Sequence, residues 1–179
     1  SRLSATAFRS SRHGSRRPEG LAYHAPVSDD LPTDELAALA DRLRDLLGPG
    51  GWLDPADAPQ LTVDYRGAYS GVPILIARPD TVDGVRNVVR VCAAAGVAVV
   101  TQGGHTSLSG GSVPTDDRPS VLLSTSRLNR ITSVDPARFT ITVEAGCTIE
   151  QVQQAATAVD RHLGMDWGAR GTATVGGAI

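Results

Sequence analysis

Residues 72–100 contain the patterns of a strand, a helix and a second strand in immediate succession, and this order restricts the fold more than any other feature of the sequence. The run "VPILIARP" at 72–79 is continuously apolar at its centre, so it predicts a strand that is covered on both faces. The segment 80–96 has helical spacing and closes on a glycine, and "VAVV" at 97–100 predicts the second strand. These three elements span about thirty residues and predict a βαβ unit, with parallel strands and a right-handed connection.

Two helices are expected to bury one face each. In the helix at 80–96 the expected buried positions are Val82, Val85, Val89 and Cys92. The segment "LPTDELAALADRLRDLLGPGG" predicts an earlier helix that is capped by Thr33 and stops at Gly48. Its expected buried stripe consists of Leu36, Leu39, Leu43, Leu46 and Leu47.

A glycine-rich loop, "TQGGHTSLSGGSVP" at 101–114, directly follows the second strand. It therefore leaves the carboxyl end of a parallel strand, which is where open α/β sheets bind their ligands. Glycines allow positive φ angles and let backbone N–H groups converge on an anion, and hydroxyl groups in the loop add neutral donors. The loop is suited to a diphosphate, whose charge can be met by many dipoles.

After this loop the pattern changes to short β-branched runs. "SVLLSTS" at 120–126, "RITSVD" at 130–135 and "FTITVEAG" at 139–146 predict a second, mostly antiparallel layer. "TIEQVQQAATAV" at 148–159 begins with a capping box and predicts one further helix. The sequence then reaches a second glycine cluster, "GARGTATVGGAI", at 168–179.

Composition excludes several classes of function. A net charge of −2 gives no basic footprint for nucleic acid, and all seventeen basic residues are arginines, so the lysine of a P-loop is missing. With four histidines and no H-E-x-x-H motif, we expect no metal site. The two cysteines, Cys92 and Cys147, belong to no C-x-x-C pair and are expected to be buried thiols. No apolar run approaches the length of about 20 residues that a membrane span needs.

The first eighteen residues, "SRLSATAFRSSRHGSRRP", are rich in Arg and Ser, contain no acidic residue and lack the apolar region of a secretory signal. We interpret residues 1–30 as a disordered tail and expect a cytoplasmic protein. A mitochondrial presequence has a similar composition, so a mitochondrial location is the alternative.

Four segments carry a resemblance to a known family. They are "VDYRGAYSGVPILIARPDTVDGVRNVVRVCAAAGVAVVTQGGHTSLSGGSVP", "LLSTSRLNRI", "VEAGCTIEQVQ" and "MDWGARGTATVGGAI". In this order and spacing they resemble the FAD-binding (PCMH-type) domain of the vanillyl-alcohol oxidase and p-cresol methylhydroxylase superfamily. Within it, the pattern is most similar to the FAD-linked D-2-hydroxyacid dehydrogenases of D-lactate, glycolate and D-2-hydroxyglutarate. The resemblance covers about residues 64–179.

The resemblance implies an α+β fold in which FAD lies extended between a small parallel α/β lobe and part of a larger antiparallel α+β lobe. We place the first lobe at 31–116 and the start of the second at 117–179. The residues implied in cofactor binding come from both glycine clusters and their flanks: Pro79, Gln102, Gly103, Gly104, His105, Thr106, Ser107, Gly110, Gly146, Asp166, Gly168, Gly171, Thr172, Gly176 and Gly177.

His105 departs from the hydroxyacid dehydrogenase pattern, which has asparagine or glycine at this position. In the berberine-bridge and carbohydrate oxidase branch, a histidine after the glycine pair bonds covalently to the flavin. A neutral imidazole is a competent nucleophile if a neighbouring group fixes its tautomer. His105 is therefore either a covalent flavin anchor or a polar substitute for asparagine.

The function implied is oxidation of a D-2-hydroxy acid to a 2-oxo acid by hydride transfer to FAD, with this chain as the FAD-binding portion. No catalytic residue is expected in the chain, because the family places the base and the substrate-binding residues in a later substrate domain. That domain is expected from the remainder of the protein or from a second chain, and the isolated fragment is expected to be inactive. Two alternatives stay open, a covalent-FAD oxidase of sugar or natural-product alcohols and a non-catalytic flavin-binding scaffold.

Overall fold

The computed structural model describes residues 31–179, so the expected tail at 1–30 lies outside the described residues. Its centre is a four-stranded sheet in the order β1-β2-β4-β3. The strands are β1 (Trp52–Leu53), β2 (Ile76–Ala77), β3 (Ala98–Gln102) and β4 (Ser120–Ser124). β4 pairs in parallel with both β2 and β3, and β1 is an antiparallel edge strand. The mixed α/β architecture with a parallel sheet confirms the predicted fold class.

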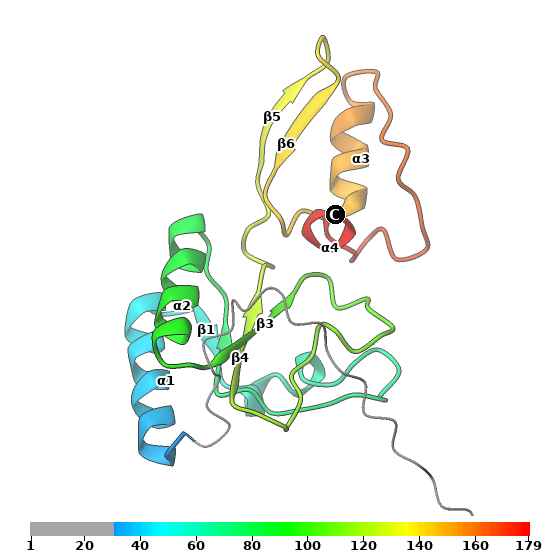
Figure 1. The fold of residues 1–179 in the computed structure, drawn as a ribbon. Helices are drawn as coiled ribbons and strands as arrows, with labels where there is room; N and C mark the ends of the chain where they lie inside the picture. Colours follow the sequence, from blue (N-terminus) through cyan, green and yellow to red (C-terminus); the bar gives the residue numbers. More distant parts are fainter. Residues whose placement is uncertain (1–30) are drawn as a thin grey trace, which may run out of the picture.

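Two helices cover one face of this sheet (Figure 1), α1 (Thr33–Leu47) and α2 (Val82–Ala94). Side chains alternate along a strand, so Leu75 and Ala77 face the helices, as do Val121 and Leu123 of β4. They form one core cluster with fully or nearly fully buried side chains of both helices, namely Leu39, Leu43, Val88, Val91 and Cys92. No helix in residues 31–179 has both the length and the apolarity to cross a membrane.

The buried stripe of α2 differs from the expected one. Val82 and Val89 are 65% and 44% exposed, whereas Val88 and Cys92 are completely buried. Two stripes of valines with the same helical spacing run along α2, and packing against α1 and the sheet decides which one is buried. In α1, Leu39 and Leu43 are buried as expected, but Leu46 is exposed, and Pro32 rather than Thr33 occupies the cap position.

The opposite face of the sheet is covered by an irregular segment with two short 3₁₀ helices, Pro55–Asp57 and Pro59–Leu61. Ala58 of this segment packs with Ile76 and Leu122, and all three side chains are buried. The expectation that the strand near 72–79 is covered on both faces is confirmed. Its hydrogen-bonded ladder is shorter than the apolar run and comprises only β2.

The later part of the chain forms the antiparallel hairpin of β5 (Ile131–Asp135) and β6 (Thr140–Val143), with α3 (Ile149–Thr157) packed beside it and the short α4 (Val175–Ala178) at its base (Figure 1). We call residues 31–125 the sheet lobe and residues 126–179 the hairpin lobe. The predicted capping box of α3 is confirmed, with Thr148 and Gln151 each bonding the other's backbone N–H.

One sequence expectation about this part is wrong. Residues 120–124 were assigned to the antiparallel layer, yet β4 lies between β2 and β3 in the parallel sheet. All five residues of β4 are buried. A short apolar run has no feature that distinguishes a central parallel strand from an antiparallel one, so its neighbours in the fold decide.

Arg127 joins the two lobes where the chain leaves β4. Its guanidinium donates to the carbonyl oxygens of Gly50 and Arg78, at 3.1 Å each, and to the carboxylate of Asp80 at 3.0 Å. Arg130 also donates to the carbonyl oxygen of Asp80 and binds Glu144 of the hairpin lobe. These bonds hold the β2–α2 connection of the sheet lobe against the start of the hairpin lobe.

The buried stripe of α2 can be tested with a matched pair of substitutions. Val88→Ala is expected to lower the free energy of unfolding by about 2 kcal/mol, because it removes buried methyl groups and leaves a cavity. Val89→Ala on the same helix should change it by less than about 0.5 kcal/mol, because this side chain is half exposed. The free energy of unfolding of both variants is measured by urea titration with circular dichroism as the signal. Equal decreases in the two variants would contradict the observed packing.

Candidate functional site

The two glycine clusters of the sequence meet in the structure. Gly103 and Gly104 follow β3 and lie directly against Thr172–Thr174 of the hairpin lobe. A Cβ atom on Gly104 would overlap with the carbonyl oxygen of Thr172, and a Cβ atom on Gly103 would overlap with the hydroxyl oxygen of Thr174. Glycine is therefore required at position 104 for this close approach of two backbones, whereas at position 103 the contact is with the side chain of Thr174.

Two open cavities, of about 550 and 450 Å³, lie around this contact. Both are lined by Gly103, Gly104, His105 and Thr174, so we treat them as two parts of one cleft. We call them the larger and the smaller cavity. The cleft runs between the carboxyl end of the parallel sheet and the hairpin lobe, which is the position expected for a ligand of an α/β sheet.

Most of the expected cofactor-binding residues line this cleft. Of the expected residues, Gly103, Gly104 and His105 line both cavities. Gln102, Gly146, Gly171 and Thr172 line the larger cavity alone. The smaller cavity is lined by Thr106, Ser107 and Gly177. The fold thus brings together residues that are up to 75 positions apart in the sequence, from Gln102 to Gly177.

Five expected residues do not line either cavity: Pro79, Gly110, Asp166, Gly168 and Gly176. Pro79 is buried at the start of α2, and the N–H group of Gly176 donates to the carbonyl oxygen of Ala145 at 2.8 Å. Gly168 is exposed. For these residues, a direct role in binding FAD stays a prediction.

Gly110 and Asp166 have other contacts. Gly110 has φ +74°, and the ring of Tyr69 occupies the place where a side chain would lie. Asp166 forms an ion pair with Arg170 at 3.0 Å, and the hydrogen bond from this arginine lowers the pKa of the carboxyl group. Gly110 therefore shapes the loop.

His105 is held in one orientation and one tautomer. Its backbone has φ +56°, in the left-handed region that few non-glycine residues adopt. Its Nε2 atom lies 2.7 Å from the carbonyl oxygen of Val63, which can only accept a hydrogen bond, so Nε2 carries the proton. In the neutral ring Nδ1 then has a free lone pair, and this atom is buried without a partner among the described residues.

Asp64 and Gln102 hold the loop that carries His105. The Asp64 carboxylate accepts hydrogen bonds from the N–H groups of Tyr69, at 2.7 Å, and Arg66, at 3.2 Å, and the bond from Tyr69 is the main cause of its lowered pKa. It fixes a turn whose ends contact the loop through Val63 and Tyr69. Gln102 is 1% exposed, and its amide donates to the carbonyl oxygens of Leu61 and Ser112. Both hydrogens of this amide are thus used within the protein.

The cleft has the electrostatics of an anion site. No Asp or Glu lines either cavity in residues 31–179. The polar groups of these residues are backbone amides, hydroxyls of serine and threonine, side-chain amides, the imidazole of His105 and one guanidinium, that of Arg78. Thr174 is 6% exposed, and its Oγ1 atom has no partner among the described residues. A buried hydroxyl without a partner at the glycine contact fits a ligand that carries hydrogen-bonding groups.

Sequence reasoning missed several residues of the cleft. Those of the larger cavity include Arg78, Ser124, Ser126, Asn129, Thr148 and Gln151. Thr174 was missed too, although it stands two residues after an expected site residue. Ser124 could not be found from the sequence, because its pairing with Gln102 depends on the entry of β4 into the parallel sheet.

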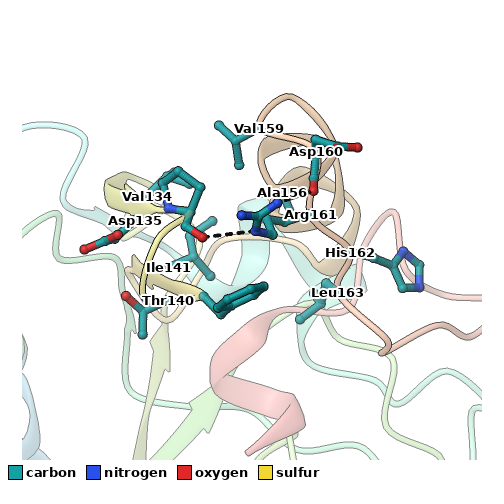
Figure 2. Close-up of a pocket in the computed structure, with 12 residues that line it drawn as sticks. Val134, Asp135, Thr140, Ile141, Ala156, Val159, Asp160, Arg161, His162 and Leu163 are labelled. Atoms are coloured by element: carbon teal, nitrogen blue, oxygen red, sulfur yellow. Dashed lines mark hydrogen bonds between the residues drawn. The ribbon is translucent and has the colours of Figure 1, made fainter.

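A third cavity, of about 480 Å³, lies between the β5–β6 hairpin and the chain after α3 (Figure 2). Arg161 crosses it, donates to the carbonyl oxygen of Pro136 at 3.0 Å and stacks on Phe139. His162 points away from the hairpin (Figure 2). None of the expected site residues lines this cavity, so we do not assign it to the candidate site.

Comparison with known proteins identifies the family of this chain. The family model described as "FAD binding domain" matches residues 73–179, which include both glycine clusters. The chain belongs to this family.

Two curated relatives and one solved structure show how far the similarity extends. The mitochondrial D-2-hydroxyglutarate dehydrogenase of Danio rerio is 34% identical over 70% of this chain, and the D-2-hydroxyglutarate dehydrogenase of Xanthomonas citri pv. viticola is 37% identical over 70%. This chain spans only 23% and 26% of their lengths. The structure of p-cresol methylhydroxylase with substrate bound matches with a TM-score of 0.63 at 22% identity, over 80% of this chain and 28% of that one, which shows a shared fold.

The contact between the glycine clusters can be tested by adding one methyl group. Gly104→Ala should lower the free energy of unfolding by about 1–3 kcal/mol, because the backbone at Thr172 must move. Hydrogen exchange should also accelerate at Ile149, whose N–H group bonds the carbonyl oxygen of Ala173. Gly111→Ala is the control, since a Cβ atom there meets nothing within 4 Å. Equal behaviour of the two variants would contradict the contact.

The role of Asp64 predicts a dependence on pH. Its pKa is lowered in the folded state, so its contribution to stability is present above the unfolded pKa, about 3.9, and is lost as the pH falls through the folded value. Asp64→Asn should therefore lower the urea midpoint at pH 7 and lower it less at pH 3. Asp45→Asn, on the exposed face of α1, is the control. If Asp64→Asn lowered the urea midpoint by the same amount at pH 3 as at pH 7, this role of the charge would be contradicted.

Proposed function

We propose that this chain binds FAD in an extended form along the cleft, as the cofactor-binding part of an oxidoreductase that converts a D-2-hydroxy acid to a 2-oxo acid. The observation that carries the proposal is the meeting of the two glycine clusters in a cleft without carboxylates, in a chain of the FAD binding domain family.

The residues of the chain would hold the cofactor mainly through dipoles. Backbone N–H groups at 103–107 and the hydroxyls of Thr106, Ser107 and Thr174, which all belong to residues that line the smaller cavity or its loop, would donate to the diphosphate. Trp167 lines the smaller cavity and is 39% exposed, so its ring can cover an aromatic part of the ligand. When bound, the flavin supplies the hydride-accepting chemistry, and the chain orients it.

The substrate class is supported by the two relatives, both named for D-2-hydroxyglutarate. Oxidation of a hydroxy acid needs a base for the hydroxyl proton and a cation for the carboxylate. We place these groups in a substrate domain, since the relatives are about three times as long as this chain. The 179-residue chain should therefore bind FAD without oxidising hydroxy acids.

The first test is reconstitution with FAD. The chain, incubated with FAD and passed through a desalting column, should retain the visible spectrum of an oxidised flavin at a ratio near one per chain. Addition of D-2-hydroxyglutarate, D-lactate or their L enantiomers should leave that spectrum unchanged. Failure to retain flavin would overturn the proposal, and bleaching by the D acids would overturn the placement of the catalytic groups outside this chain.

The substrate class is tested in the protein that carries both domains. Its flavin spectrum should bleach without oxygen on addition of a D-2-hydroxy acid and persist with the L enantiomer. If the spectrum of oxidised flavin persisted with every hydroxy acid, the result would favour a non-catalytic flavin-binding scaffold.

A second candidate, the oxidase with covalent FAD, is favoured by one specific observation. Val63 fixes the His105 tautomer that leaves Nδ1 as a buried lone pair facing no protein partner. A bond from Nδ1 to the flavin 8α carbon would replace one C–H bond, release one proton and transfer two electrons to dioxygen. His105 would keep the Nε2 proton that it donates to Val63.

Acid precipitation distinguishes the two candidates. If FAD is not covalently bound, all yellow colour should pass into the supernatant, for the wild type and for His105→Asn alike. Colour retained in the wild-type pellet and lost in the His105→Asn pellet, with flavin mass on the peptide containing His105, would establish the bond and favour the oxidase. This readout does not depend on knowing the substrate.

A further inference from the structure

We propose that Arg78 is the cation that binds the phosphate groups of the cofactor in the larger cavity; this inference rests on the proposed binding of FAD. Arg78 follows β2 directly and lines the larger cavity. Ala77 pairs with Leu123, so continuing the register by one residue places Arg78 opposite Ser124. Ser124 in turn pairs with Gln102, which begins the glycine loop. The three residues form one row across the carboxyl ends of the three parallel strands.

The alternation of side chains directs this row toward the cleft. Ile76 packs on the face that is covered by the irregular segment, and Arg78 stands two positions later on the same face. Gln102 also points to this face, because its amide bonds the carbonyl oxygen of Leu61. Two strand spacings, about 10 Å, separate the backbones of Arg78 and Gln102, so a long side chain on the first reaches toward the loop on the second.

Arg78 has no counter-ion in the described part of the chain. Its backbone N–H group donates to Gly51 and its carbonyl oxygen accepts from Arg127, but its guanidinium forms no hydrogen bond or ion pair within residues 31–179. The nearest acid in the sequence, Asp80, is already bound by Arg127. The side chain is partly buried, so its charge loses part of its hydration.

A partly buried arginine that lines the same cavity as the glycine loop, with no carboxylate in the lining formed by residues 31–179, fits an anion with two charged groups. Arg78 would bind one side of the diphosphate and the loop at 103–107 the other. Arginine donates two parallel hydrogen bonds to phosphate oxygens, whereas lysine supplies only a point charge.

The test compares the affinity for FAD with that for riboflavin, which lacks phosphate, both followed by flavin fluorescence. Arg78→Met should weaken FAD binding about tenfold or more and leave riboflavin binding unchanged. FAD binding by this variant should also depend less on salt than in the wild type, because one charge is removed. Arg78→Lys should restore part of the affinity. Arg90→Met, on the exposed side of α2, is the matched control and should bind FAD as the wild type does.

The possible outcomes separate this inference from the proposed function. An Arg78→Met chain that is folded by circular dichroism and binds FAD with wild-type affinity and salt dependence would overturn the role of Arg78 and leave the FAD site intact. Equal weakening for FAD and riboflavin, without recovery in Arg78→Lys, would show a structural role and also overturn it. A wild-type chain that binds no FAD would overturn the proposed function itself.

Discussion

The site depends on the contact of two backbones at Gly104. There the loop after β3 approaches the backbone of Thr172 so closely that no side chain fits between them, and the neighbouring Gly103 lies against the side chain of Thr174. Two backbone hydrogen bonds tie the second cluster to the hairpin lobe, from Val175 to Cys147 and from Gly176 to Ala145. The cleft therefore has one wall from each lobe, and its width is set where the glycines meet.

The walls of the cleft are fixed by residues that need not touch a ligand. Asp64 holds the turn that contacts the glycine loop through Val63 and Tyr69, and Gln102 anchors the start of the loop to two carbonyl oxygens. Away from the glycine loop, Arg127 links the β2–α2 connection to the start of the hairpin lobe. Binding groups that are preorganised in this way lose little conformational entropy when a ligand arrives.

The charges of the cleft agree with the chemistry of its proposed ligand. The chain has no lysine, and the part of the cleft formed by residues 31–179 contains one arginine and no carboxylate, so the charge of a diphosphate would be met mainly by N–H and O–H dipoles. His105 adds an imidazole ring, with the Nε2 proton directed at the carbonyl oxygen of Val63, at the point that both cavities share. The two candidate functions differ in whether the Nδ1 atom of His105 forms a covalent bond to the flavin.

Much of this could be predicted from local patterns. The βαβ unit, the capping box of α3 and the buried cysteines are confirmed, because periodicity, capping residues and isolated thiols each depend on a few neighbouring residues. The resemblance to the family is confirmed too, since its glycine motifs are contiguous in the sequence.

The sequence by itself determined the three longer helices, the βαβ unit and the glycine loop after β3, whereas the short β1 and α4 were not predicted. Only the tertiary structure decided that β4 enters the parallel sheet, that Val88 rather than Val89 is buried, and that Arg78, Ser124 and Gln102 form one row. The physical reason is that helix and strand formation depends on residues a few positions apart. Burial, strand order and the surroundings of a charge depend instead on contacts between segments tens of residues apart, which no local pattern encodes.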